Sequence, residues 1–248
     1  MPFAKTSLAN YVTETIRGVV RAEVLDPMKS DGKLYREPRI FEDLLSSQPL
    51  CFNLFGELQQ DLGLATRTFE SLLGEPGIEV TTIEFEHSPG RGDPRFTNDG
   101  SAFDVFVSYL RRHGPKGFVG IEVKYAESLD GSPARHRARY EEVADAMGVF
   151  IPDSRGRLRQ PPLEQLWRDH LLAGSLLLNR ASEFERGHFA VVYPSGNAIV
   201  SKALDAYGTC LRDRSTFVTW TLEGVLSAIE SAGGASWVRE VRERYLGP

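Results

Sequence analysis

The hydrophobic positions change their period along the chain, which divides it into predicted helices and strands. Over residues 39 to 73, apolar side chains recur at three- and four-residue steps, for example at Phe52, Phe55 and Leu58. This spacing places them on one face of a helix. The pattern predicts helices that end before Gly74, because glycine often follows the last turn of a helix.

The segments after this glycine alternate between apolar and polar residues instead. From Ile78 the sequence IEVTTIEFEH has the two-residue period of a strand. Two apolar runs follow, Phe103 to Leu110 and Gly117 to Tyr125, and the RRHGPK between them contains turn residues. These runs predict an antiparallel hairpin that continues the first strand.

The second half of the chain mixes both periods. It predicts helices over 134–148, 162–179 and 198–208, strands over 188–194 and 215–222, and two helices in the last two dozen residues. We therefore expect one α/β domain over residues 1–248, with a mixed central sheet flanked by helices. The sheet begins as a meander and gains a strand after a helical crossover.

Composition narrows the class of protein. Hydrophobic residues make up 41% of the 248 and charged residues 25%, which is typical of a globular protein. The net charge of -5 lacks the strongly basic signature of a dedicated nucleic-acid binder. The acidity is uneven, however, because residues 91 to 180 carry a net charge of +2 and the remainder -7.

The cysteines and the apolar runs bear on the compartment. Cys51 and Cys210 lie too far apart in sequence to indicate a disulfide framework or a zinc site. The longest apolar stretch, LLAGSLLL at Leu171 to Leu178, is shorter than the ~18 residues of a membrane span. We expect free, partly buried thiols in a cytoplasmic protein that does not enter a membrane.

Charged residues inside the predicted hairpin are its most informative feature, because a half-buried charge is costly without a partner. Alternation places Phe103 and Val105 on one face of their strand and Asp104 on the other. On the next strand it places Glu122 and Lys124 on a common face, about 6 to 7 Å apart. We expect the three charged side chains to meet at one site.

This combination of residue types suits phosphodiester hydrolysis assisted by a divalent metal. Asp104 and Glu122 can supply two hard oxygen ligands, and the backbone carbonyl of Val123 can supply a third. The ammonium of Lys124 can stabilise the developing charge on a phosphate or hold the attacking water.

Asp104 followed by Glu122-Val123-Lys124 on paired strands resembles the active-site motif of the PD-(D/E)XK nuclease superfamily. The resemblance covers roughly Glu57 to Trp220 and implies a restriction-endonuclease-like core (α-β-β-β-α-β) over about 50–221. Residues 1–38 would be an N-terminal extension, and the C-terminal strand and helices would be additional. One departure is that Phe103 stands where the motif has proline.

The resemblance also implies a function and further site residues. It assigns metal binding to Asp104 and Glu122, with Mg²⁺ or Mn²⁺ as cofactor, and assistance in catalysis to Lys124. A glutamate before the sheet, best matched by Glu57, would join the metal site, and Gln165 would be an accessory residue. DNA is the more expected substrate.

Each of these residues has a simpler interpretation. Glu122 and Lys124 could form a solvated ion pair on an edge strand, and a second triplet of this type, Asp31-Gly32-Lys33, lies in a predicted turn. Glu57 could be an exposed helix residue, and so could Gln165.

Several residues near the motif could contact nucleic-acid phosphates, as basic side chains commonly do. They could equally be a strand-end histidine and solvated arginines. Asp99 is a candidate metal ligand, but the Asn-Asp-Gly sequence around it favours a turn. The candidate phosphate contacts are His87, Arg91, Arg135, Arg137 and Arg139.

The sequence thus supports a metal-dependent nuclease first. A catalytically inactive module that binds nucleic acid or a protein partner is the alternative, and a purely structural ion pair is the third. Because no separate recognition domain is evident, target choice would come from a homodimer or from a partner protein.

Overall fold

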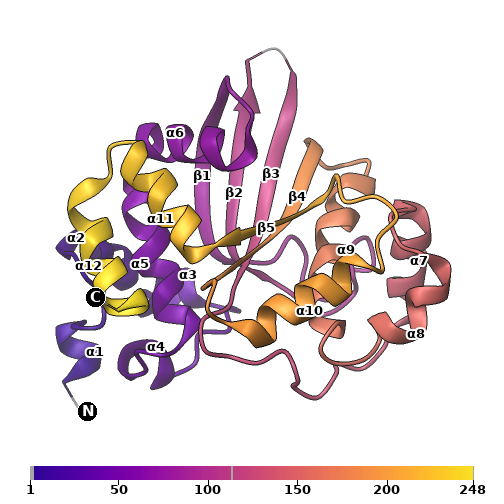
Figure 1. The fold of residues 1–248 in the computed structure, drawn as a ribbon, viewed down its shortest axis with the longest axis horizontal. Coiled ribbons are helices and arrows are strands. Elements are labelled where there is room, and N and C mark those ends of the chain that lie inside the picture. The colour runs from indigo at the N-terminus through magenta and orange to yellow at the C-terminus, as the bar shows by residue number, and fades with distance from the viewer. Residues whose placement is uncertain (1–2, 113, 248) are drawn as a thin grey trace.

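A computed structural model describes residues 3–112 and 114–247 and contains a mixed five-strand sheet in the order β1-β2-β3-β4-β5 (Figure 1). The first three strands form an antiparallel meander, whereas β4 is parallel to β3 and β5 is parallel to β4. The predicted topology is therefore confirmed. The strands are β1 (Ile78–His87), β2 (Phe103–Arg111), β3 (Gly114–Val123), β4 (Phe184–Tyr193) and β5 (Phe217–Thr221).

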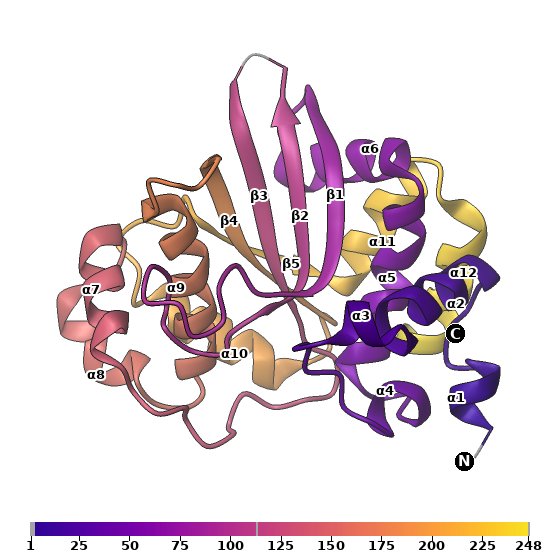
Figure 2. The same ribbon diagram turned by 180° about the vertical axis from the view of Figure 1, so that it is seen from behind.

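One face of the sheet is covered by helices from both ends of the chain (Figures 1 and 2). Side chains that alternate along the strands, such as Val105, Val107, Ile121 and Val123, are fully buried in this layer. The principal helices are α5 (Ser47–Gln60), α6 (Leu62–Leu73), α11 (Leu222–Ser231) and α12 (Ala235–Leu246).

The opposite face packs against helices from the middle of the chain. Phe106, Phe118 and Phe189 form the sheet side of this second apolar cluster. Phe103 belongs to the same cluster, so its predicted place beside Val105 is wrong; its ring lies over Gly120 of β3 instead. The helices are α7 (Ala138–Met147), α8 (Arg155–Leu158), α9 (Glu164–Leu178) and α10 (Ala198–Gly208).

The N-terminal segment packs closely against the sheet-covering helices. Asn53 of α5 is fully buried, accepts a hydrogen bond from the Val12 N–H and donates one to the Asn10 carbonyl, each at 3.0 Å. Tyr11 donates to the Ile40 carbonyl at 2.8 Å. The short helices here are α1 (Ala4–Ser7), α2 (Glu14–Val20), a π-helical turn (Arg21–Leu25), α3 (Pro27–Ser30) and α4 (Arg39–Glu42).

Two predicted boundaries move in ways that affect the site. Strand β3 ends at Val123 rather than Tyr125, although the Lys124 N–H still donates to the Val192 carbonyl of β4 at 2.8 Å. Helix α7 begins at Ala138, so the residues before it form a loop.

The two cysteines and the lengths of the helices bear on the expectations about disulfides and membrane insertion. Cys51 and Cys210 are both free and buried. Within residues 3–112 and 114–247, every helix is too short or too polar to cross a bilayer.

Candidate active site

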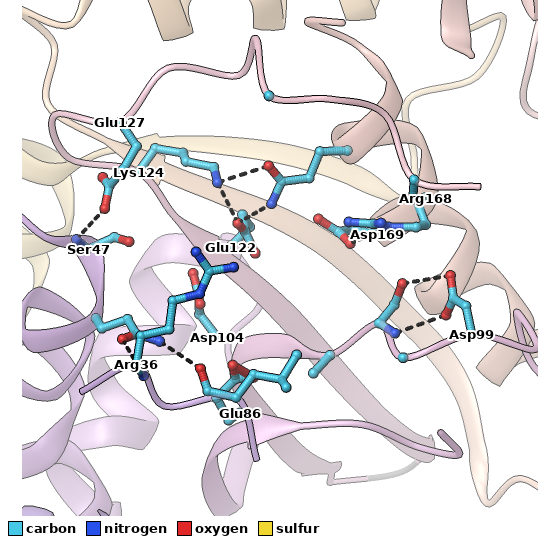
Figure 3. Close-up of a pocket in the computed structure, with 18 of the residues that line it drawn as sticks. Arg36, Ser47, Glu86, Asp99, Asp104, Glu122, Lys124, Glu127, Arg168 and Asp169 are labelled. Carbon is cyan, nitrogen blue, oxygen red and sulfur yellow. Dashed lines mark hydrogen bonds and ion pairs between the residues drawn. The ribbon is translucent and has the colours of Figure 1, made fainter. Parts of the chain in front are cut away.

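Three carboxylates lie side by side across the meander, near one edge of a cavity (Figure 3). The registers of the strand pairs place Glu86 of β1 opposite Asp104 of β2, and Asp104 opposite Glu122 of β3. The Val123 N–H donates a hydrogen bond of 2.7 Å to Oδ2 of Asp104. The pleat of the sheet thus places all three side chains on one face of the sheet.

Glu122, Lys124 and Gln165 form a closed triangle of polar contacts. Nζ of Lys124 lies 2.8 Å from Oε1 of Glu122, and Nε2 of Gln165 donates to the same oxygen at 2.7 Å. Nζ of Lys124 also donates to Oε1 of Gln165 at 3.1 Å. Glu122 is 6% exposed and Lys124 8%, so the interpretation as a solvated surface pair is wrong.

The charges at this site are strongly coupled. Burial raises the pKa of Asp104 and the neighbouring Glu122 raises it further, against the opposing effects of Lys124 and the Val123 N–H. Burial disfavours the charged form of Lys124, but Glu122 and Asp104 outweigh it and raise the pKa of the ammonium. The two carboxylates, Asp104 and Glu122, therefore outnumber the one ammonium between them. This excess favours the binding of an added cation.

Glu86 is a site residue that the sequence pattern did not reveal. Its φ of 50° lies in the left-handed region, which is uncommon for a residue with a side chain and often marks functional positions. Burial raises the pKa of this carboxyl to about 7, helped by Glu122 and opposed by Arg91. The register with Asp104 was the signal that could have found it.

Helix α9 brings a second missed carboxylate to the cavity. Gln165, Arg168 and Asp169 are three and four residues apart, so they share one helix face, and all three line the cavity. Asp169 is 3% exposed, and its Oδ2 accepts no hydrogen bond from the part of the chain that is described. Burial raises the pKa of Asp169, and Glu122 raises it further.

The cavity has a volume of about 670 Å³ and a polar lining of mixed charge. Its walls come from the N-terminal segment, the three antiparallel strands, the loop after β3 and helix α9. The Glu127 carboxylate joins two of these walls, because it accepts hydrogen bonds from the Ser47 N–H, the Tyr125 N–H and the Arg39 guanidinium. These bonds fix the turn that follows Lys124.

The donor set fits a hard divalent cation. Asp104 and Glu122 offer carboxylate oxygens, which Mg²⁺ and Mn²⁺ prefer. Among the residues described, no group of three or more His, Cys, Asp or Glu side chains is placed to hold a metal ion. Two protein carboxylates with water in the remaining positions is the usual arrangement for Mg²⁺, which keeps several of its waters.

Comparison with known families identifies the fold. The sequence matches the family model of the PD-(D/E)XK nuclease superfamily over residues 2–247. The chain belongs to this superfamily. No curated protein and no solved structure gives a match. PD-(D/E)XK proteins are generally nucleases and typically use divalent metals, and the mixed sheet flanked by helices agrees with their restriction-endonuclease-like fold.

The structure does not place Glu57, the helix residue that the PD-(D/E)XK resemblance implied as a metal ligand, in the cavity. Glu57 lies on α5 outside the lining, and its carboxylate accepts a hydrogen bond from the Thr13 hydroxyl of the N-terminal segment. Glu86 is the additional acidic residue beside Asp104 instead. Gln165, by contrast, lies on α9 and bonds to Lys124 at 3.1 Å.

Three of the residues expected to contact phosphates do not line the cavity. His87 stacks on Phe106 and pairs with Glu84 at 3.3 Å. Arg91 donates to the Gly100 carbonyl at 2.8 Å, and Arg139 donates to the Phe96 carbonyl at 2.9 Å. The two arginines hold the loop before β2, whose contacts the sequence could not reveal.

The remaining two, Arg135 and Arg137, do line the cavity. Both are exposed, as is Arg36 on the opposite wall. Within residues 3–112 and 114–247 none of the three forms an ion pair, so each keeps its charge for a ligand. Asp99 also lines the cavity, but its carboxylate accepts four hydrogen bonds. They come from the Thr97 and Tyr140 hydroxyls and from the N–H and hydroxyl of Ser101, in agreement with the turn interpretation.

Proposed function

We propose that this protein is a metal-dependent nuclease that hydrolyses phosphodiester bonds, with DNA as its expected substrate. The observation that carries the proposal is the placement of Asp104 and Glu122 on adjacent paired strands with the Lys124 ammonium 2.8 Å from Glu122. Membership of the PD-(D/E)XK superfamily supports the same reaction class.

The carboxylates of Asp104 and Glu122, with the Val123 carbonyl, would hold Mg²⁺ or Mn²⁺. The bound ion would polarise the scissile phosphate and lower the pKa of a coordinated water. The hydrogen bond from the Val123 N–H orients Asp104, and Glu122 is buried at 6% exposure. Glu86 adds negative charge on the far side of Asp104.

Lys124 acts on the reacting groups, and Gln165 positions Lys124. The Lys124 ammonium stabilises negative charge that develops on the phosphate, and burial strengthens this interaction. Gln165 bonds to both Glu122 and Lys124, so it holds these two side chains in place. Its role is therefore positioning.

Arginines on opposite walls would bind the phosphates that flank the scissile bond. Arg36 lies on one wall, close enough to Glu86 to favour the charged form of that carboxyl, and Arg135 and Arg137 lie on the other wall. Phosphate contacts of this kind fix the register of a strand without reading its sequence. Basic groups at the cavity also explain how a chain of net charge -5 can attract a polyanion.

A panel of substrates tests the proposal. Labelled duplex DNA, single-stranded DNA and RNA are incubated with Mg²⁺, with Mn²⁺ and with EDTA. We expect cleavage of at least one DNA substrate with metal and none with EDTA. Cleavage that persists in EDTA would contradict the mechanism, and salt-dependent binding without any cleavage would favour the catalytically inactive module.

A further inference from the structure

Helix α9 carries an arginine that faces the cavity beside the candidate catalytic groups. Arg168 lies three residues after Gln165, so the two side chains share one face of the helix, and both line the cavity. Gln165 bonds to Lys124 and to Glu122, which places this face of α9 next to the reacting groups. In Figure 3 the guanidinium of Arg168 points toward Asp169 and Glu122. A substrate strand whose phosphate contacts Lys124 would therefore pass close to Arg168.

The outer nitrogens of the Arg168 guanidinium are free to bind a ligand. Nη1 lies 3.9 Å from Oε1 of Glu164, and Nε lies 3.9 Å from Oδ1 of Asp169, so both carboxylates are beyond hydrogen-bond distance. The Nε atom is buried, whereas Nη1 and Nη2 remain accessible. Among the residues described, neither of these two nitrogens donates a hydrogen bond. Arg168 therefore offers two accessible nitrogens with N–H donors to a molecule in the cavity.

Arg168 keeps its positive charge although its side chain is only 23% exposed. Burial disfavours the charged form, but the carboxylates of Asp169, Glu164 and Asp99 outweigh it and raise the pKa of the guanidinium. These carboxylates hold Arg168 by charge, without hydrogen bonds, so its planar pair of donors is not used within the protein. A guanidinium in this state suits a bidentate contact with an oxyanion such as phosphate.

The loop that packs beside Arg168 carries two further arginines. Ala134 of the loop after β3 lines a smaller pocket together with Arg168, and Arg135 and Arg137 of the same loop line the main cavity. These three guanidinium groups therefore belong to neighbouring segments, and together they offset the nearby carboxylates when a polyanion approaches. Arg135 and Arg137 are exposed, whereas Arg168 is half-buried on a helix, so Arg168 has the better defined position.

We propose that Arg168 binds the substrate phosphate next to the scissile one, through hydrogen bonds from Nη1 and Nη2 to its two non-bridging oxygens. Lys124 serves the scissile phosphate itself. Gln165 contacts Lys124, and Arg168 lies about one helical turn further along α9, so the adjoining phosphate is the one that Arg168 meets. This inference rests on the proposed nuclease function and adds a second phosphate position to it.

The salt dependence of DNA binding tests whether Arg168 contacts a phosphate. A labelled DNA oligonucleotide is titrated with protein at several NaCl concentrations, with Ca²⁺ in place of Mg²⁺, and fluorescence anisotropy gives the affinity. Loss of one phosphate contact reduces the slope of log affinity against log salt by about 0.7–0.9. We expect Arg168→Ala to reduce the slope by this amount and to weaken binding about tenfold at low salt. Arg180→Ala, which alters an exposed arginine outside the cavity, should keep the wild-type slope.

A second variant, Arg168→Lys, separates the charge from the shape of the guanidinium. Lysine keeps the charge but lacks the planar pair of donors, so we expect the wild-type slope with an affinity between those of the wild type and Arg168→Ala. A smaller folded fraction would lower the apparent affinity by the same factor at every salt concentration and leave the slope unchanged. A wild-type slope in Arg168→Ala would therefore overturn the proposal, and so would an equal reduction of the slope in Arg168→Lys and Arg168→Ala.

Cleavage kinetics distinguish the adjoining phosphate from the scissile one. Removal of a contact that is equally strong in the ground state and the transition state raises KM and leaves kcat unchanged. Arg168→Ala should therefore raise KM with little change in kcat, and a fall in kcat at an unchanged KM would overturn the assignment to the adjoining phosphate. If the wild type binds DNA but does not cleave it, the proposed function fails, and the slope still decides whether Arg168 contacts a phosphate. Undetectable binding of DNA by the wild type would contradict both.

Discussion

The Glu122 carboxylate interacts with several groups at once, and the chemistry of the site depends on these interactions. Lys124 and Gln165 both bond to its Oε1, and Asp104, Asp169 and Glu86 add negative charge nearby. Like charges gathered in a buried site oppose folding unless a cation compensates for them. The arrangement is therefore expected to lower stability in return for metal binding, a common trade-off at functional sites.

Replacing one of these carboxylates by an amide should reveal that trade-off. We expect Asp104→Asn to raise the melting temperature of the metal-free protein, by an amount equivalent to about 1 kcal/mol, because it removes a buried like charge. Mg²⁺ should stabilise the wild type, by about 2.7 kcal/mol at one hundred times its dissociation constant, but not the variant. Differential scanning calorimetry measures both effects, with Asp205→Asn on the exposed face of α10 as control. Equal stabilisation of wild type and Asp104→Asn by Mg²⁺ would remove Asp104 from the metal site.

A buried histidine makes a separate contribution to the pH dependence of stability. His170 is fully buried between Tyr207 and Thr216, and burial lowers its pKa to about 3. Between pH 3 and the ordinary value near 6.5, the unfolded chain binds a proton that the folded protein does not, so stability falls with decreasing pH. The slope from this one group is at most about 1.4 kcal/mol per pH unit.

Urea unfolding at several pH values checks this account of His170. The variant His170→Gln should be less stable at pH 7 but should lose stability more slowly than the wild type as the pH falls from 6.5 to 4. Parallel pH profiles for the two proteins would show that His170 does not titrate in this way.

At the scale of residues, the sequence predicted the unusual charges but not the whole site. We could predict Asp104, Glu122 and Lys124 because a charged residue inside an apolar strand is conspicuous. Glu86 lies in a strand that also contains Glu79 and Glu84, and Asp169 lies in a helix with other polar residues, so neither differs from its surroundings in sequence. Only the strand register and the helix packing place them at the cavity.

Neighbouring strands are held together by aromatic rings that lie over glycines on the next strand. The Phe103 ring covers Gly120, and the Phe118 ring covers Gly187. A Cβ at Gly120 would lie 2.4 Å from Cε1 of Phe103. This contact explains why Phe103 leaves the face that strict alternation predicts.

Substitution of Gly120 should therefore weaken the sheet. We expect Gly120→Ala to lower the free energy of unfolding by about 1–3 kcal/mol, since the added methyl group overpacks the contact with Phe103. Gly18→Ala on α2, where nothing lies within 4 Å, is the matched control and should be stabilising by up to about 1 kcal/mol. Denaturation in urea compares them. If Gly120→Ala is as stable as Gly18→Ala, the close packing of the ring is not a constraint.

The periodicity was sufficient for the elements themselves. Alternation in β1 to β3 and the three- to four-residue spacing in α5 and α9 are strong local patterns, so order and type of these elements could be predicted. The ends of the elements could not be predicted as well, because the end of β3 at Val123 and the start of α7 at Ala138 depend on tertiary contacts.

Over the whole molecule, segments distant in sequence complete the site. The N-terminal segment supplies Arg36, and the Glu127 carboxylate ties the loop after β3 to the start of α5. Asn53 donates to the Tyr245 hydroxyl of α12 at 2.8 Å as well as to Asn10. That residues 1–38 form an N-terminal extension stays a prediction, because such long-range contacts leave no local pattern in the sequence.

The central claim is that Lys124, between Glu122 and Gln165, assists phosphodiester cleavage by this PD-(D/E)XK protein. The most direct measurement is the initial rate of cleavage of a labelled DNA with Mg²⁺ by the wild type, Lys124→Ala and the control Lys116→Ala, which alters an exposed lysine paired with Glu183. We predict a loss of at least about 100-fold in Lys124→Ala, the usual scale for removing a group that stabilises the transition state, and an unchanged rate in Lys116→Ala. Full activity of a folded Lys124→Ala protein would contradict the account.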